Sequence, residues 1–253
     1  MMEKILGLPV LASKHGRDVD NLIIYVHWLM AALFAGWMLY FVYVLFRFRK
    51  SRNPKADYIG VKNHSSTYIE GIVAVIEGIL LLAFAIPFWS RAVGDFPKES
   101  DSTVVKVVAQ QFAWNVRYPG KDTIFGTNRF DLVTLDNQLG LDPADPHGKD
   151  DILTLNEIRV PVDKPVIIYL SSKDVIHSFK LIAARLTQDA IPGMMIPLHF
   201  TPVTKGKFQI NCAQLCGNGH SGMSGGFLYV ESAEDYQKWI DSKSGATGQK
   251  SFE

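Results

Sequence analysis

The feature that most constrains the fold is an uncharged apolar run at residues 22–46. About 20 apolar residues suffice to cross a lipid bilayer as a helix. A second run of spanning length, residues 69–89, carries two acidic side chains, Glu70 and Glu77. A buried helix of a soluble protein would be shorter and would show a polar face. The sequence therefore predicts a hairpin of two transmembrane helices over residues 22–90.

Cationic residues are concentrated in the segment that joins the two runs, residues 47–68. This segment holds Arg47, Arg49, Lys50, Arg52, Lys55 and Lys62, whereas residues 1–21 hold only Lys4, Lys14 and Arg17. Loops rich in Lys and Arg remain on the cytoplasmic side of a membrane. We therefore expect a cytoplasmic loop at residues 47–68, an extracytoplasmic N-terminal segment at residues 1–21, and both termini on the outer face.

Residues 91–253 show the pattern of an all-β domain with a short C-terminal helix. Runs rich in Val and aromatic residues alternate with turns that contain Pro, Gly, Asp and Lys. These runs are residues 102–118, 156–162, 165–172, 206–212 and 225–231. Ser232 and Asp235 can form a capping box that opens a helix through Ile240. The acidic segment 136–151 is predicted to be a surface loop, and the strand spacing favours a β-sandwich or barrel.

Both cysteines of the chain lie in one segment, residues 212–223 (CAQLCGNGHSGM), together with His220 and Met223. A disulfide or a zinc ion would ordinarily explain two cysteines near a histidine. The methionine argues against both, because a thioether is a poor zinc ligand but a familiar weak ligand of copper in electron-transfer sites. With two thiols, the segment has enough ligands for two coppers bridged by two sulfurs.

Such a site needs another imidazole. His177 lies in SSKDVIHSF, next to an apolar strand and far from the cysteines in sequence, as a site in a β-sandwich requires. His199, in MIPLHFTPV, is the rival, and we interpret it as a structural or interface residue. Asp174, or the backbone after His177, is a candidate to orient the imidazole through a hydrogen bond.

Taken together, these motifs resemble subunit II of the cytochrome c oxidases, the haem–copper terminal oxidases of respiration. The resemblance covers the two membrane helices, QQFAWNVRYPG, SSKDVIHSF, LTQDAIPGM and CAQLCGNGHSGM. It implies a cupredoxin-like Greek-key β-barrel that carries a dinuclear copper centre, CuA. The implied ligands are the bridging thiolates of Cys212 and Cys216, the imidazoles of His177 and His220, the weak axial ligand Met223, and the backbone carbonyl of Gln214.

The resemblance also implies a function and partners. The chain would accept electrons one at a time from cytochrome c, or from a haem c domain of a neighbouring complex. It would pass them to haem in subunit I, where O₂ is reduced to water with proton pumping, so no catalytic residue is expected in this chain. The complex would lie in a bacterial cytoplasmic membrane or, alternatively, a mitochondrial inner membrane. A net charge of +1 gives no indication of nucleic-acid binding.

Further residues are implied by matching positions. Glu70 matches the carboxylate at the mouth of a proton pathway into subunit I, and Gln111 and Asp174 fall where the donor is expected to dock. Acidic residues of the loop could, with Asp174, steer a basic cytochrome c towards the copper face. These loop residues are Asp142, Asp145, Asp150 and Asp151.

The sequence departs from the family pattern at two places. Gln214 stands where many relatives have a glutamate that also reaches a magnesium ion at the interface with subunit I, so the resemblance does not carry that magnesium site over. The aromatic motif where electrons enter reads Gln-Phe-Ala-Trp, with Phe112 at the position of the first tryptophan and Trp114 retained. Core packing explains Trp114 as well as an electronic role does. No Cys-x-x-Cys-His motif is present, so we expect no covalent haem c in this chain.

Three other functions fit less well. A quinol oxidase subunit II has the same architecture but lacks the copper ligands. A nitrous oxide reductase would need a large second domain. A membrane-anchored copper chaperone would not need two spans that carry glutamates.

Overall fold

The computed structural model describes residues 2–55, 58–60 and 62–244. Residues 56, 57 and 61 of the predicted loop and residues 245–253 of the predicted β domain lie outside the described residues. The chain divides into two compact units, which are considered separately. One comprises Met1–Leu8 and Asp18–Arg91, and the other comprises Pro9–Arg17 and Ala92–Glu253.

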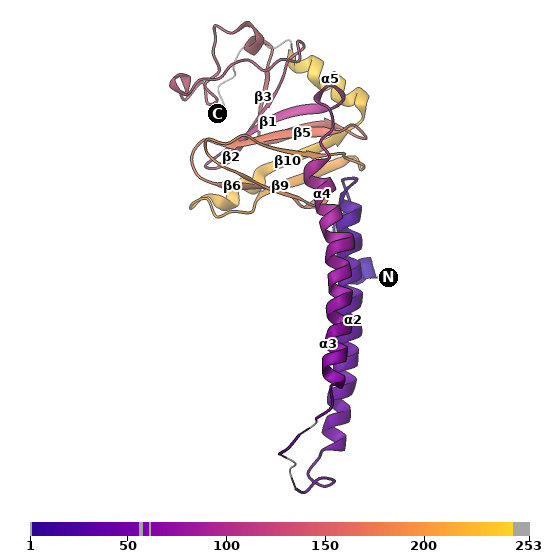
Figure 1. Cartoon of the computed structure of the whole chain (residues 1–253). Helices are drawn as coiled ribbons and strands as arrows, with labels where there is room; N and C mark the ends of the chain where they lie inside the picture. Colours follow the sequence, from indigo (N-terminus) through magenta and orange to yellow (C-terminus); the bar gives the residue numbers. More distant parts are fainter. Residues whose placement is uncertain (1, 56–57, 61, 245–253) are drawn as a thin grey trace. The chain divides into compact units, whose positions relative to one another are not determined.

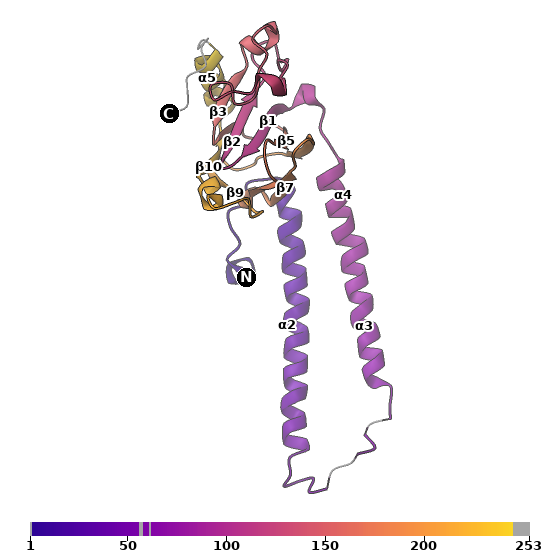
Figure 2. The same ribbon diagram turned by 90° about the vertical axis from the view of Figure 1, so that its left-hand side faces the viewer.

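The first unit is a helical hairpin preceded by the short helix α1 (Met2–Leu6). Helix α2 (Gly16–Arg47) is antiparallel to a second long helix, which extends from Ser65 to Gly94 (Figure 2). Both are long and apolar enough to span a membrane, and their apolar windows are 0% buried within the chain. This exposure excludes the core helix of a soluble protein and supports the prediction of two membrane helices. The ring centres of Tyr25 on one helix and Phe84 on the other lie 5.7 Å apart, where the two helices pack.

The second long helix contains one irregular turn. Helix α3 (Ser65–Ile79) continues through a π-helical turn (Leu80–Ala85) into α4 (Ile86–Gly94). Pro87 follows this turn, and a proline removes a hydrogen bond to the residue four positions earlier and clashes with its carbonyl. The wider π-helical turn accommodates this defect without ending the helix.

The second unit is built from two five-stranded sheets, which form separate layers in Figure 1. The strand order is β3-β2-β1-β5-β8 in one sheet and β4-β10-β9-β6-β7 in the other. The strands are β1 (Thr103–Gln110), β2 (Ala113–Tyr118), β3 (Ile152–Leu155), β4 (Glu157–Pro161), β5 (Val166–Ser172), β6 (His177–Leu181), β7 (Leu186–Ala190), β8 (Ile196–Phe200), β9 (Gly206–Cys212) and β10 (Gly226–Glu231). The pairs β1–β5 and β4–β10 are parallel, and the other pairs are antiparallel. The predicted cupredoxin-like β domain is thus confirmed.

The hydrophobic core lies between the two sheets. Strand β1 alternates buried and half-buried residues, because one of its faces points into the core. Every residue of β2 is buried, since residues 119–151 cover the outer face of this strand. Trp114 on β2 meets Phe179 on β6 edge to face at 5.4 Å, and both rings are fully buried. These aromatic side chains bury large apolar areas, so they join the sheets directly beneath the predicted copper ligands.

The predicted strand runs match β1, β2, β4, β5, β9 and β10. Strands β3, β6, β7 and β8 were not predicted, because each is only four or five residues long and offers too short a run for a clear pattern. Three of them, β3, β7 and β8, lie at sheet edges. The C-terminal helix α5 (Ala233–Ser244) begins at the predicted capping residues. The hydroxyl of Ser232 accepts a hydrogen bond from the backbone N–H of Asp235 at 3.1 Å.

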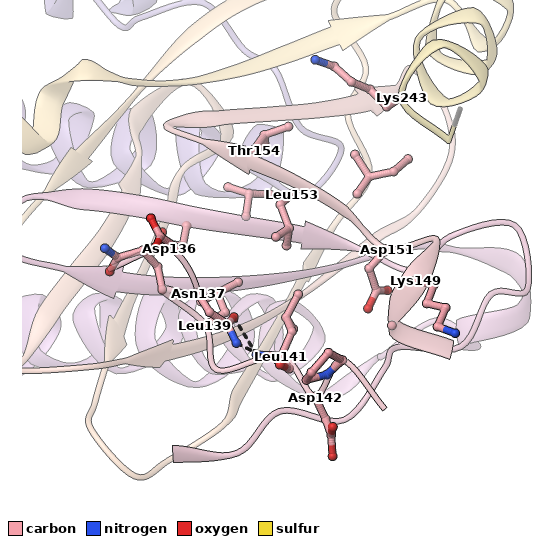
Figure 3. Close-up of a pocket in the computed structure, with 16 residues that line it drawn as sticks. Asp136, Asn137, Leu139, Leu141, Asp142, Lys149, Asp151, Leu153, Thr154 and Lys243 are labelled. Carbon is pink, nitrogen blue, oxygen red and sulfur yellow. Dashed lines mark hydrogen bonds between the residues drawn. The ribbon is translucent and has the colours of Figure 1, made fainter. Parts of the chain in front are cut away.

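The acidic segment is mostly the predicted surface loop, with one exception. The side chain of Asp151 is 0% exposed and pairs with Arg117, which is 4% exposed. The same carboxylate accepts from the backbone N–H of Gly126 at 3.1 Å. Asp151 therefore anchors residues 119–151, the insertion between β2 and β3, to β2. Hydrogen bonds from Thr127 and from the backbone N–H of His147 lower the pKa of Asp145 to about 2. A pocket of about 510 Å³ separates the insertion from β2 and β3 (Figure 3).

Pro9–Arg17, which leads into the first residues of α2, belongs to the β unit rather than to the helical hairpin. The backbone of Ala12 donates to Ala183 at 2.8 Å and accepts from Val203 at 3.0 Å. The hydroxyl of Ser13, whose side chain is fully buried, donates to the carbonyl of Ala184 at 2.6 Å. Part of the predicted N-terminal segment therefore pairs with the β domain like an additional short strand.

Candidate metal centre

Sheet pairing brings the two halves of the predicted metal site together. Strands β6 and β9 are antiparallel neighbours, with Phe179 opposite Cys212. His177 begins β6 and Cys212 ends β9, so the register brings them to the same end of these two neighbouring strands. The other predicted ligands follow in the loop after β9. This loop ends in a 3₁₀ turn (His220–Gly225), which directs Met223 back into the core.

The candidate donor atoms converge. The two Sγ atoms lie 3.9 Å apart, and both cysteines are free thiols. His220 Nδ1 is 3.3 Å from Cys216 Sγ, and His177 Nδ1 is 3.0 Å from Met223 Sδ. Cys212 Sγ is 4.0 Å from His177 Nδ1 and 3.1 Å from the carbonyl oxygen of Gln214. The thiols thus lie between one group formed by His177 and Met223 and the donors His220 and Gln214.

The donor set fits a soft metal. A metal–sulfur bond is about 2.3 Å long, so two sulfurs 3.9 Å apart can both bind one ion. Thiolates and a thioether select copper among the common biological metals, and imidazole binds both of its usual oxidation states. A disulfide is not formed between the cysteines. Among the described residues, His177, Cys212 and Cys216 form the one cluster of His, Cys or carboxylate groups close enough to hold an ion together.

The site is closed on its inner side and open on its outer side. His177 and Met223 are 0% exposed and Cys216 is 4% exposed, whereas Cys212 and His220 are half-buried. Burial, and then the neighbouring Cys212 thiol, raises the pKa of Cys216 to about 11. Because a metal ion binds the thiolate form, copper loading would release protons.

Hydrogen bonds orient the buried ligands. His177 Nε2 lies 2.8 Å from a carboxylate oxygen of Asp174, which leaves Nδ1 facing the sulfurs. Partial burial would by itself raise the pKa of Asp174, but hydrogen bonds, the largest from His177, lower it below its ordinary value. The indole N–H of Trp114 donates to the carbonyl of Met223 at 3.0 Å. Trp114 therefore has a packing and positioning role beneath the site, and its ring centre is 6.3 Å from that of His177.

The loop that follows β9 and carries Cys216 is called the metal loop below. The residues expected to accept the electron and to dock the donor protein lie beside it. Gln111 and Phe112 form the turn between β1 and β2. The Phe112 ring lies against Gly219, where a Cβ atom would come within 2.4 Å of it. The carboxylate of Asp174 already accepts hydrogen bonds, including one from the Gln111 backbone. The Asp174 side chain is still 30% exposed. The donor-docking roles expected for Gln111 and Asp174 stay predictions.

Other predicted residues lie elsewhere. Glu70 is an exposed residue of α3 in the other unit, and its role at a proton pathway stays a prediction. Asp151 is unavailable for steering a donor, because it is buried against Arg117. Arg117 is four residues from Ala113 along β2, about 13 Å from the turn beside the metal loop. His199, the rival ligand, packs against Phe96 with ring centres 4.4 Å apart, outside the cluster.

Sequence reasoning missed how the ligand loops are held. The side chain of Gln111 donates to the carbonyl of Cys216 at 2.6 Å. Gly217 has a positive φ of 135°, and a Cβ there would come within 2.8 Å of the Gln111 amide. The two glycines near Cys216 were the available signal, because glycine permits close backbone approach. Their partner across the loop could not be identified from sequence.

Comparison with known proteins finds relatives that match most of this chain. Residues 103–227 match the family described as cytochrome c oxidase subunit II, periplasmic domain. The alternative cytochrome c oxidase subunit 2 of Bradyrhizobium diazoefficiens is 31% identical over 229 residues, which cover 89% of this chain and 80% of that protein. Cytochrome c oxidase subunit 2 of Cereibacter sphaeroides is 28% identical over 248 residues, which cover 94% and 78% of the two chains.

A solved structure is similar to the β unit. The crystal structure of the periplasmic domain of cytochrome oxidase subunit II of Bradyrhizobium japonicum is 28% identical and has a TM-score of 0.42. The match covers 60% of this chain and 99% of the solved chain. From the near full-length likeness to the Bradyrhizobium diazoefficiens protein, the chain belongs to the cytochrome c oxidase subunit II family.

Proposed function

We propose that the chain binds a dinuclear copper centre, CuA, and uses it to receive electrons for a cytochrome c oxidase. Cys212 and Cys216 would bridge the two coppers. His177 and Met223 would complete one copper, and His220 with the carbonyl of Gln214 the other. The observation that carries this proposal is that each of the two thiols lies 3.1 to 4.0 Å from one donor of each group.

The chain's own residues suit rapid electron transfer. When bound, copper supplies a one-electron site whose charge is shared over two nuclei. Cys212 and His177 are fixed by the pairing of β9 with β6, and Met223 is fixed by burial and by Trp114. Ligands that cannot move far keep nearly the same geometry in both oxidation states, which keeps the reorganisation energy low. Cys212 and His220 are half-buried, so they offer a short route to a docked donor.

The partners follow from this role. The donor would be a cytochrome c, or a haem c domain of a neighbouring complex, and the acceptor would be haem in subunit I. Phe112 packs against the metal loop at Gly217 and Gly219, and its position in the chain matches the family's aromatic residue that receives the electron. The aspartates of the insertion other than Asp151 remain available for steering a basic donor. Gln214 offers its backbone carbonyl to copper, but an uncharged side chain to magnesium, so we propose no magnesium site.

A membrane orientation is also supported. Pro9–Arg17, which ends within the first turn of α2, belongs to the β unit, and the chain returns to that unit at Ala92, in the last turn of α4. Both ends of the helical hairpin thus attach to one domain, as two membrane crossings require. Together with the cations of the connecting loop, this favours a cytoplasmic loop and an extracytoplasmic copper domain in a bacterial cytoplasmic membrane.

The test is to load the purified full-length chain with copper and record its copper content and its electron paramagnetic resonance spectrum. We expect two coppers per chain and an unpaired electron shared over both nuclei. Changing Cys216→Ser should abolish this shared spectrum, because one bridging sulfur is lost. Binding of one zinc ion, or of a single blue copper with one thiol free, would refute the dinuclear assignment.

A further inference from the structure

The turn between β1 and β2 contacts both loops that carry the predicted copper ligands. This turn consists of Gln111 and Phe112, between the last residue of β1 and the first residue of β2. One of these loops, residues 173–176, leads directly to His177 at the start of β6, and the other, which follows β9, supplies Cys216. The two loops come from different parts of the chain, so their relative position depends on tertiary contacts.

The side chain of Gln111 and the ring of Phe112 hold the Cys216 loop. The Gln111 amide nitrogen donates to the carbonyl of Cys216 at 2.6 Å. Phe112 packs against the loop backbone so closely that a Cβ at Gly217 or Gly219 would lie 3.1 Å or 2.4 Å from its ring. Cys216 lies four residues beyond the end of β9, so sheet pairing does not fix it as it fixes Cys212. The turn supplies this missing restraint.

The backbone of the same residue holds the His177 loop. The N–H of Gln111 donates to one carboxylate oxygen of Asp174 at 2.7 Å. The other carboxylate oxygen lies 2.8 Å from His177 Nε2. A continuous path of hydrogen bonds therefore joins the carbonyl of Cys216, Gln111, Asp174 and the His177 ring. A substitution at Gln111 can remove the side-chain hydrogen bond to Cys216 alone, because the backbone N–H that binds Asp174 is retained.

We propose that Gln111 is a positioning residue of the metal centre, which ties the Cys216 loop to the His177 loop and thereby slows the loss of copper. This role rests on the proposed copper function and differs from the docking role expected for the same position. A docking residue would act on the donor cytochrome. A positioning residue acts on the metal whether or not a donor is present.

The decisive variant is Gln111→Met, which keeps the side chain's length and the backbone N–H but removes the amide donor. Gln111→Asn is a second variant, which keeps the amide but shortens the side chain by one methylene. The matched control is Gln237→Met, which removes a side-chain amide that donates to Asp241 at 3.2 Å within α5 and contacts neither ligand loop. All variants are made in the full-length chain and loaded with copper.

The first measurement is the rate at which the reduced chain loses Cu(I) to an excess of a soluble chelator, together with the copper hyperfine splitting of the oxidised chain. We expect Gln111→Met and Gln111→Asn to lose copper about fivefold faster than the unsubstituted chain, the factor expected from one lost hydrogen bond. Their hyperfine splitting should shift, and Gln237→Met should match the unsubstituted chain. The unfolding temperature of each metal-free variant shows whether the fold is retained.

The second measurement is the KM of the assembled oxidase for soluble cytochrome c. Unchanged copper loss and spectra in both Gln111 variants would overturn the proposal, and an increase in KM alone would return Gln111 to the docking surface. If the unsubstituted chain bound no copper, the proposed function would fail instead, so the two failures are distinguishable.

Discussion

At the scale of single residues, the donor atoms differ in how firmly the chain holds them. Met223 is fully buried, lies 3.0 Å from His177 Nδ1 and 3.5 Å from Cys216 Sγ, and has its backbone carbonyl bound by Trp114. This methionine can therefore act as a weak ligand without moving. Leucine has nearly the same volume as methionine but no sulfur, so a leucine at position 223 would remove this donor and still fill its space.

We predict that Met223→Leu keeps both coppers but raises the midpoint potential by an amount on the order of tens of millivolts, because loss of a donor disfavours the oxidised state. Stability should change by less than about 1.5 kcal/mol, since leucine and methionine have similar volumes. A potentiometric titration followed by optical absorption measures the shift. Met194→Leu, at a methionine that is 52% exposed, is the control and should leave the potential unchanged.

At the scale of elements, the insertion after β2 depends on one buried ion pair. Arg117 and Asp151 are 4% and 0% exposed, and the guanidinium also donates to the carbonyl of Gly126 at 2.5 Å. The pair fastens both ends of the insertion to an otherwise exposed face of β2. The aspartate that the sequence assigned to a solvated loop is therefore the anchor of that loop.

We predict that Asp151→Asn lowers the free energy of unfolding by about 3–5 kcal/mol, because it leaves the guanidinium of Arg117 buried without a counter-charge. Urea unfolding of the metal-free chain, followed by tryptophan fluorescence, measures the change. Asp131→Asn is the matched control. Asp131 pairs with Arg129 in solvent, with side chains 63% and 55% exposed, and pairs this exposed contribute little to stability. Equal effects of the two substitutions would contradict the anchoring role.

At the scale of the whole molecule, the second long helix, which extends from Ser65 to Gly94, carries two carboxylates, and the β unit carries the metal site. Glu70 lies in the first turns of α3, next to the predicted cytoplasmic loop, and Glu77 lies two helical turns further on. Ionisable groups at membrane depth usually face protein or water and serve a function. The two units would then serve two separate steps, proton delivery and electron acceptance.

We predict that Glu70→Ala slows turnover of the assembled oxidase several-fold, while reduction of the copper centre by cytochrome c keeps its normal rate. The reason is that a carboxylate at a pathway mouth delivers protons to subunit I but does not contact the electron route. Stopped-flow absorption separates the two steps. Glu70→Asp retains the carboxylate and should restore most of the turnover. Normal turnover in Glu70→Ala would leave this residue as a helix-end carboxylate stabilised by the helix dipole.

The sequence by itself determined the features that depend on local pattern. Length and apolarity define the two spanning helices, because a bilayer admits few alternatives. Alternation defined most strands, and Ser232 with Asp235 defined the start of α5. The ligand types of residues 212–223 indicated a soft metal, because thioether, thiolate and imidazole have intrinsic metal preferences. None of these inferences needed a contact between distant residues.

Only the tertiary structure decided how distant residues meet. The register of β6 against β9 brings His177 to Cys212, and the turn at Gln111 reaches both ligand loops. The burial of Asp151 and the pairing of Pro9–Arg17 with the β unit were likewise outside the reach of sequence pattern. The physical reason is that a side chain's burial and partners depend on which strands become neighbours, and this is a property of the packed sheets rather than of any local run of residues.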